Sequence, residues 1–134
     1  MREILFRGKD LSGVLNRSWI FGSLDTTEKE HPSIIYLDRF GNRCRISVEP
    51  KTVGQYTGLT DKNGKKIFEG DIVERLWLGE KHIYRIYYDN DIASFIGTDI
   101  YSERFTTFDY DACEFEVIGN IYDNPELLEL SKGD

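Results

Sequence analysis

The most reactive side chains in this sequence are two cysteines and two histidines. Cys44 and Cys113 supply thiols, and His31 and His82 supply imidazoles. A thiol becomes a nucleophile when a neighbouring base takes its proton, so a cysteine–histidine pair is the first chemistry to consider. Cys44, however, falls among the apolar positions of an alternating strand, which predicts a buried and unreactive thiol. We therefore expect no catalytic residues and interpret both cysteines as buried thiols in a reducing compartment.

The acidic clusters are the next candidates, as ligands for a metal ion. Asp89-Asn90-Asp91 begins like a calcium-binding loop, but Ser94 and Ile100 stand where the EF-hand pattern requires Gly and Glu. In Asp61-Lys62-Asn63-Gly64 the glycine comes too early for that pattern. The two cysteines are far apart and form no zinc-binding spacing. We expect neither a metal nor another cofactor, and interpret both acidic stretches as solvated turns.

Composition limits the functional classes further. The 134 residues suit one domain or two small lobes. With 17 Lys and Arg against 24 Asp and Glu, the net charge of −7 opposes the phosphate backbone of nucleic acids, although a local basic face remains compatible with it. The sequence has no apolar run long enough for a membrane helix, and its first residues do not resemble a secretion signal. We expect a cytoplasmic protein that contacts no membrane.

The stretch from Gln55 to Glu74 organises the second half of the chain. Asn63-Gly64, between apolar runs, is a strong hairpin signal, because both residues tolerate a left-handed backbone. Glu69-Gly70-Asp71 predicts a second reversal soon afterwards. Two reversals so close together indicate short strands that meet at a corner, as they do in small β-barrels.

A second hairpin is predicted earlier in the chain, with strands at Ile34–Asp38 and Arg43–Val48. Apolar and polar residues alternate along its second strand, which indicates one buried and one solvated face. Arg39, Arg43 and Arg45 then gather near the turn on the solvated face. Two interpretations remain: a simple solvated strand face, or a surface that contacts nucleic acid or an acidic partner.

The end of the chain predicts a strand followed by a short helix. Phe115 to Ile121 is the strand, and Gly119 within it indicates a bulge or a close backbone approach. Asn124 is suited to cap a helix that begins at Pro125. The last residues, 131–134, are expected to fray.

Three segments resemble the YopX family of small phage and prophage proteins. They read QYTGLTDKNGKKIFEGDIV from residue 55, EVIGNIYDNPELL from residue 116 and, more loosely, REILFRGKD from residue 2. The family has no assigned biochemical function, so the resemblance implies a fold and an origin in a bacterial host rather than a mechanism. It also implies that the barrel is of the SH3-like kind. We interpret the matching residues as shaping turns and corners: Tyr56, Gly58, Asp61, Asn63, Gly64, Gly70, Asp71, Gly119 and Asn120.

The sequence therefore predicts a mainly β protein with minor α content. Residues 1–54 form an N-terminal β lobe, 55–122 a Gly-rich small SH3-like barrel, and 123–134 a short helix with a frayed tail. The predicted function is a non-catalytic, phage-derived binding or assembly module whose partner is another protein or a second copy of itself. The alternative is a nucleic-acid-associated accessory protein that uses Arg39, Arg43 and Arg45.

Overall fold

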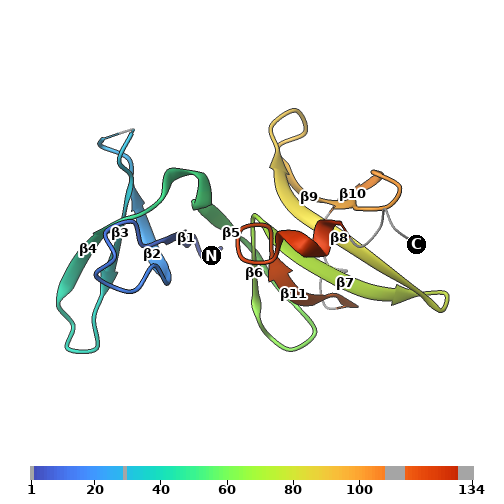
Figure 1. Cartoon of the computed structure of the whole chain (residues 1–134), viewed down its shortest axis with the longest axis horizontal. Helices are drawn as coiled ribbons and strands as arrows, with labels where there is room; N and C mark the ends of the chain where they lie inside the picture. Colours follow the sequence, from blue (N-terminus) through green and yellow to red (C-terminus); the bar gives the residue numbers. More distant parts are fainter. Residues whose placement is uncertain (1, 29, 108–113, 130–134) are drawn as a thin grey trace. The chain divides into compact units, whose positions relative to one another are not determined.

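A computed structural model describes residues 2–28, 30–107 and 114–129. The chain is mainly β, as predicted, and its strands form two antiparallel sheets (Figure 1). It divides into two compact units, residues 1–56 and residues 57–134, which we call the first and second units. Strand β5 (Gly54–Thr60) begins in the first unit and continues into the second.

The first unit is a sheet in which neighbouring strands are antiparallel. Along the chain it contains β1 (Phe6–Lys9), β2 (Trp19–Asp25), β3 (Ser33–Leu37), β4 (Arg43–Ser47), the 3-10 helix η1 (Pro50–Thr52) and the start of β5. The strand order is β4-β3-β2-β1-β5. The hairpin predicted around residues 34–48 is confirmed, because β3 and β4 pair with Ile35 opposite Arg45.

The core of the first unit lies on one face of this sheet. Ile20, Ile34 and Val48 are its buried centre, and Phe6, Tyr36 and Ile46 pack against them. The loop after β1 is shaped by Asp10, whose buried carboxylate accepts the N–H groups of Ser12 at 3.0 Å and Leu15 at 2.8 Å. A buried carboxylate of this kind replaces the backbone partners that an irregular loop otherwise lacks.

The second unit contains a hairpin and a five-stranded sheet around one core. After β5 come β6 (Lys66–Phe68), β7 (Asp71–Trp77), β8 (Glu80–Asp89), β9 (Ser94–Asp99), β10 (Phe105–Thr107), β11 (Glu116–Asn120) and the 3-10 helix η3 (Pro125–Leu128). The five-stranded sheet has the order β10-β9-β8-β7-β11, and β5 pairs with β6. Five buried side chains from both parts form the core, namely Ile67, Val73, Tyr84, Ile86 and Phe115.

Gly70 joins the β6–β7 reversal to the rest of the second unit. Its φ of 90° places it in the left-handed region that favours glycine. Its N–H donates to the Ile86 carbonyl at 2.8 Å, and its own carbonyl accepts the N–H of Ile121 at 2.9 Å. The predicted corner is therefore confirmed at this position. The strand pairs in the described residues do not by themselves close into a barrel, and the SH3-like barrel stays a prediction.

The C-terminal region differs from the prediction in its cap and its helix. Gly119 lies at a shift in the β11–β7 register, so the expectation of a bulge is confirmed. A Cβ there would approach the Asn124 Oδ1 atom to 2.5 Å, so the close neighbour is a side chain and not a backbone segment. Asn124, however, makes no side-chain cap, because its Oδ1 accepts the N–H of Asn120 at 3.2 Å instead. Only a four-residue 3-10 helix follows. Residues 131–134, predicted to fray, lie outside the described residues.

Replacing Gly64 by valine tests the predicted Asn63-Gly64 turn. Gly64 has a φ of 80°, its N–H donates to the Asp61 carbonyl at 3.0 Å, and no atom would lie within 4 Å of an added Cβ. Backbone strain is therefore the main cost, and we expect Gly64→Val to lower the free energy of unfolding by about 1–3 kcal/mol. Gly64→Asn should cost less, because asparagine tolerates this conformation. Thermal unfolding measures both variants; equal melting temperatures for Gly64→Val and wild type would contradict the structural role.

Candidate functional site

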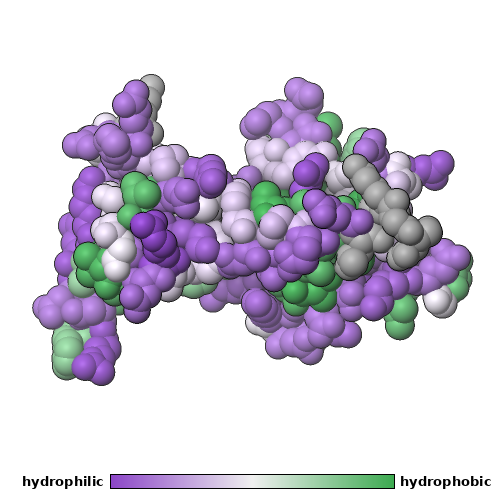
Figure 2. Space-filling model, in the orientation of Figure 1, coloured by the Kyte–Doolittle hydropathy of each residue, from purple (hydrophilic) through white to green (hydrophobic). Residues whose placement is uncertain are grey.

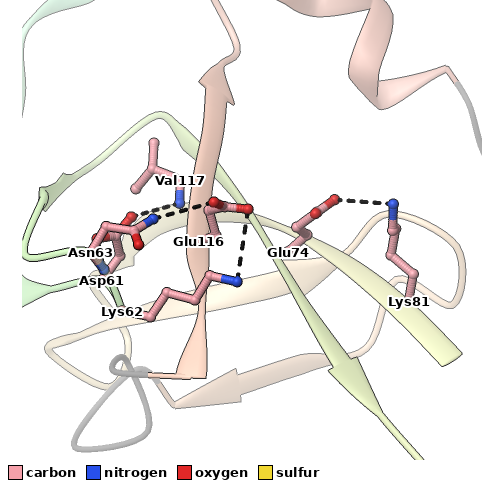
Figure 3. A network of polar contacts seen from close by, with 7 residues as sticks. All are labelled: Asp61, Lys62, Asn63, Glu74, Lys81, Glu116 and Val117. Carbon is pink, nitrogen blue, oxygen red and sulfur yellow. Dashed lines mark hydrogen bonds and ion pairs between the residues drawn. The ribbon is translucent and has the colours of Figure 1, made fainter. Parts of the chain in front are cut away.

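The Asp61 carboxylate is the centre of a polar network in the second unit. Its Oδ1 atom accepts the N–H groups of Asn63 at 2.8 Å and Lys65 at 2.9 Å, which fixes the turn between β5 and β6. Its Oδ2 atom accepts the N–H of Val117 at 3.0 Å, so the turn is bound to β11 (Figure 3). One buried side chain thus joins segments that are more than 50 residues apart.

Further contacts between the same two segments surround Asp61. The Lys62 N–H donates to the Phe115 carbonyl at 2.9 Å, and the Asn63 side-chain amide donates to Glu116 Oε1 at 3.2 Å. Lys62 Nζ lies 4.0 Å from Glu116 Oε2, while the nearby Glu74–Lys81 pair in Figure 3 has a separation of 3.7 Å. These exposed ion pairs contribute little to stability compared with the buried carboxylate.

Burial and hydrogen bonding act in opposite directions on Asp61. Desolvation by burial raises its pKa, but the N–H donors of Val117, Lys65 and Asn63 stabilise the charged form and together outweigh that effect. The pKa of Asp61 therefore lies below its ordinary value. The carboxylate stays charged at neutral pH and serves as a fixed acceptor for backbone donors.

The other residues of the resemblance occupy similar positions near reversals. Asp71 is buried and accepts the Phe68 N–H at 2.8 Å across the Gly70 turn. The Asn120 Oδ1 atom accepts the N–H groups of Tyr122 at 3.0 Å and Asp123 at 2.9 Å. Gly58 has a φ of 89°, and Tyr56 is 7% exposed. Each of these residues touches backbone or packs inside its unit, a geometry consistent with shaping the chain.

The three arginines proposed as a contact surface are all exposed, but their surroundings differ. Arg45 forms an ion pair with Asp25, whose pKa is lowered chiefly by the Thr27 hydroxyl and N–H and further by Arg45. The guanidinium of Arg39 lies 4.9 Å from the centre of the Phe40 ring. Arg43 stands opposite Leu37 across the hairpin and has no ion pair among the described residues. Charge is therefore most available at Arg39 and Arg43.

Strand register adds residues to this surface that the sequence did not single out. Arg7 faces Phe21 and Lys9 faces Trp19 across β1 and β2. Further along β2, Ser23 faces Ile35, which in turn faces Arg45, and Leu37 faces Arg43. Because alternate residues of a strand share one face, all of these side chains lie on the face opposite the core.

We call this surface the cation-rimmed face. Its apolar centre is Trp19, Phe21, Ile35 and Leu37, and its rims are Arg7 and Lys9 on β1 and Arg43 and Arg45 on β4. At the centre, Phe21 is 47% exposed and Leu37 is 70% exposed. On the β1 side, the Arg7 guanidinium lies 4.4 Å and the Lys9 ammonium 5.7 Å from the Trp19 ring centre. Figure 2 shows apolar surface among hydrophilic surface over β2–β4 and at the tip of the β3–β4 hairpin.

The second unit contains a separate open pocket of about 760 Å³. Its residues come from the start of β8 and from the β9–β10 region: Glu80, Lys81, His82, Tyr84, Asp99, Tyr101, Ser102, Arg104, Phe105 and Thr106. His82 Nδ1 lies 3.3 Å from Asp99 Oδ2, while Asp99 Oδ1 accepts the Tyr101 N–H at 2.7 Å. Among the described contacts, His82 is hydrogen-bonded to Asp99 and to no hydroxyl or thiol.

The cysteine and histidine expectations have mixed outcomes. Cys44 is on the core side of β4, as predicted, but it is half-buried rather than fully buried because it lies next to the hairpin turn. Its Sγ atom is 3.6 Å from the Asn42 carbonyl. His31 is exposed in the loop before β3. Cys113 lies outside the described residues.

The described residues also bear on metals and membranes. Within residues 2–28, 30–107 and 114–129, no group of three or more His, Cys, Asp or Glu side chains is arranged to hold a metal ion. The Asp89 carboxylate instead accepts the Asp91 N–H at 2.8 Å within its own turn. In the same part of the chain, no helix combines the length and apolar character needed to cross a membrane.

Comparison with known proteins places the chain by sequence. Residues 6–129 match the family described as YopX protein. The chain belongs to the YopX family. No curated protein matched the sequence of this YopX protein. A solved structure with similarity to it is the crystal structure of protein EF1440 from Enterococcus faecalis, at 23% identity over 96% of this chain and 99% of that chain, with a TM-score of 0.48.

Replacing Asp61 by asparagine tests the role of its charge. At neutral pH we expect Asp61→Asn to lower the free energy of unfolding by about 1–3 kcal/mol, because buried N–H groups lose a charged acceptor. The pKa of Asp61 is lowered in the folded state, so its stabilisation is present above the unfolded pKa of about 3.9 and is lost as pH falls through the folded value. Denaturant unfolding between pH 7 and pH 3 should show the difference between wild type and variant shrinking in acid.

The matched control for this experiment is Glu126→Gln, which removes an exposed carboxylate of η3. It should leave the stability close to that of wild type across the same pH range. An Asp61→Asn effect that did not change with pH would contradict the electrostatic explanation.

Proposed function

We propose that this YopX protein is a non-catalytic binding module that acts by self-association, and that the cation-rimmed face is its contact surface. The supporting observation is that the register of β1–β4 places an apolar centre, in which Phe21 and Leu37 are exposed, between the cations of β1 and β4 on one sheet face. The exposed cations are those of β4, because Arg7 on β1 is buried. Soluble monomers rarely expose contiguous apolar patches of this kind, and such patches commonly mark sites of protein contact. The cations around the centre favour an acidic surface as the partner.

The case for binding rather than catalysis rests on the distribution of the chemical groups. The residues that define the cation-rimmed face include arginine and lysine but no histidine, thiol or carboxylate, and the Asp25 carboxylate beside them is paired with Arg45. The face therefore offers electrostatic attraction and apolar area without a group suited to proton transfer. The His82–Asp99 pair belongs to the other unit and, as described above, has no bonded nucleophile among the described contacts.

We propose further that the second unit is a small barrel of the SH3-like kind and that the protein is phage-derived and works in the cytoplasm of a bacterial host. The barrel is supported by the single core that the β5–β6 hairpin shares with the five-stranded sheet. It is supported further by the backbone hydrogen bonds that join Gly70 to Ile86 and to Ile121. The origin is supported by membership of the family.

Replacing Leu37 by serine tests the proposed surface. Wild-type protein should show a mass above 15.6 kDa by light scattering after size exclusion, and the excess should decrease at high salt. Leu37→Ser should shift the population toward monomer, because Leu37 is 70% exposed at the centre of the face and contributes apolar area on association.

The control is Val14→Ser, a similarly exposed aliphatic residue of the first unit that lies outside the face, at 73% exposure. It should leave the mass distribution unchanged. A wild-type chain that stays monomeric at every concentration and salt would contradict self-association, and equal effects of the two variants would contradict the chosen surface.

A second candidate function is the contact of nucleic acid through Arg39, Arg43 and Arg45. The observation that favours it is that Arg39 and Arg43 are exposed on the first unit without an ion pair among the described residues. Fluorescence anisotropy with a labelled oligothymidine measures it. Binding should weaken steeply with salt, and Arg39→Glu with Arg43→Glu should abolish it. Binding that survives this double reversal would rule out this surface.

A further inference from the structure

The two units have opposite net charges. Residues 1–56 contain nine Lys and Arg against seven Asp and Glu, a net charge of +2. Residues 57–134 contain eight against seventeen, a net charge of −9. The net charge of −7 for the whole chain is therefore the sum of a basic first unit and an acidic second unit. Two copies of such a chain attract each other when the first unit of one meets the second unit of the other.

The β8–β9 turn of the second unit combines carboxylates with exposed apolar side chains, which is the combination that a partner of the cation-rimmed face needs. Asp89 and Asp91 lie in this turn between two apolar residues, Tyr88 at 37% exposure and Ile92 at 49% exposure. Neither carboxylate has an ion pair among the described residues. The turn therefore presents unpaired acidic groups together with exposed apolar area.

Five other acidic residues of the second unit are less available. Glu74 pairs with Lys81, Glu114 with Arg75 and Glu116 with Lys62. The Asp61 and Asp71 carboxylates are buried and accept backbone N–H groups. Glu80, Glu103, Glu126 and Glu129 are exposed as well, but the β8–β9 turn differs from them because two carboxylates lie there between two exposed apolar side chains.

Asp89 also pre-organises the turn for binding. Its Oδ1 atom accepts the Asp91 N–H at 2.8 Å, and Ala93 holds a φ of 51° at the turn's end. A turn fixed in this way loses less conformational freedom on association than a flexible loop does. Asp91 itself is exposed, so its carboxylate can meet a cation of a partner.

We propose that the β8–β9 turn of one copy docks on the cation-rimmed face of a second copy. Asp91 meets Arg43 at the rim and Arg39 in the adjoining β3–β4 turn, and Ile92 packs on Leu37 at the centre. This inference rests on the proposed function and names its partner. The contact joins two different surfaces of identical chains, so it is heterologous, and its repetition builds a closed ring or an open filament.

A charge swap in the full-length chain tests the proposal. Arg43→Asp and Asp91→Arg each change the charge by two units on one side of the contact. In sedimentation velocity at low salt, each variant alone should show a dissociation constant raised by about tenfold or more, because like charges then face each other. An equimolar mixture of the two variants should regain association close to that of wild type, because each keeps the half that the other needs.

Two controls carry the same charge changes elsewhere. Lys51→Asp changes an exposed lysine of η1, and Glu126→Arg changes an exposed residue of η3. Neither should weaken association by a comparable factor, and their mixture should show no recovery beyond either variant alone.

The outcomes separate this inference from the proposed function. Association of wild type that Leu37→Ser weakens but Asp91→Arg leaves unchanged would overturn the docking of the β8–β9 turn and keep the face as an interface. Absence of recovery in the mixture would overturn it as well. Wild type that is monomeric at millimolar concentration would overturn both. Tight binding of oligothymidine, lost in Arg43→Asp and unaffected in Asp91→Arg, would assign the face to nucleic acid.

Discussion

The second unit depends on a single buried carboxylate. Asp61 accepts N–H groups from its own turn and from Val117 in the last strand, so the hairpin and the end of the sheet are held in one register. A chain with many short strands has long loops to close before its distant contacts form, and each closure costs conformational entropy. A single charged acceptor that binds several N–H donors stabilises such a closed loop effectively, because hydrogen bonds to charged groups are stronger than those between neutral groups.

The first unit is organised by its register rather than by one side chain. Alternation along β2, β3 and β4 sends Ile20, Ile34 and Ile46 to the core and sends Phe21, Ile35 and Arg45 to the other face. A slip of one residue would exchange the two faces. The same alternation that builds the core therefore also assembles the surface to which we assign binding, and fold and function are coupled at the level of strand pairing.

Local sequence patterns predicted local structure well. The arginine hairpin, the Asn63-Gly64 turn, the Gly70 reversal and the irregularity at Gly119 are each indicated by residue types within a short stretch of sequence. Features that depend on competition between hydrogen-bonding groups, or on strands brought together by the fold, were missed or wrong. Asn124 has the right residue type for a helix cap, but the N–H of Asn120 competes for its side chain. The full cation-rimmed face forms only when β1 and β2 pair beside β3 and β4. The pocket forms only when the start of β8 lies beside the β9–β10 region. No short sequence pattern encodes either arrangement.

The Asn63-Gly64 turn also gives the protein a finite chemical lifetime. Asparagine followed by glycine is the dipeptide most prone to deamidation, in which the glycine nitrogen attacks the asparagine side chain, ammonia leaves and a cyclic imide opens to aspartate or isoaspartate. Here that nitrogen donates to the Asp61 carbonyl, and the asparagine amide donates to Glu116, so both reacting groups are held in the folded turn. Folding therefore protects the Asn63 side chain from deamidation. If Asn63 is deamidated while the chain is unfolded, refolding places a carboxylate next to Glu116, and the hydrogen bond between the two side chains is replaced by repulsion.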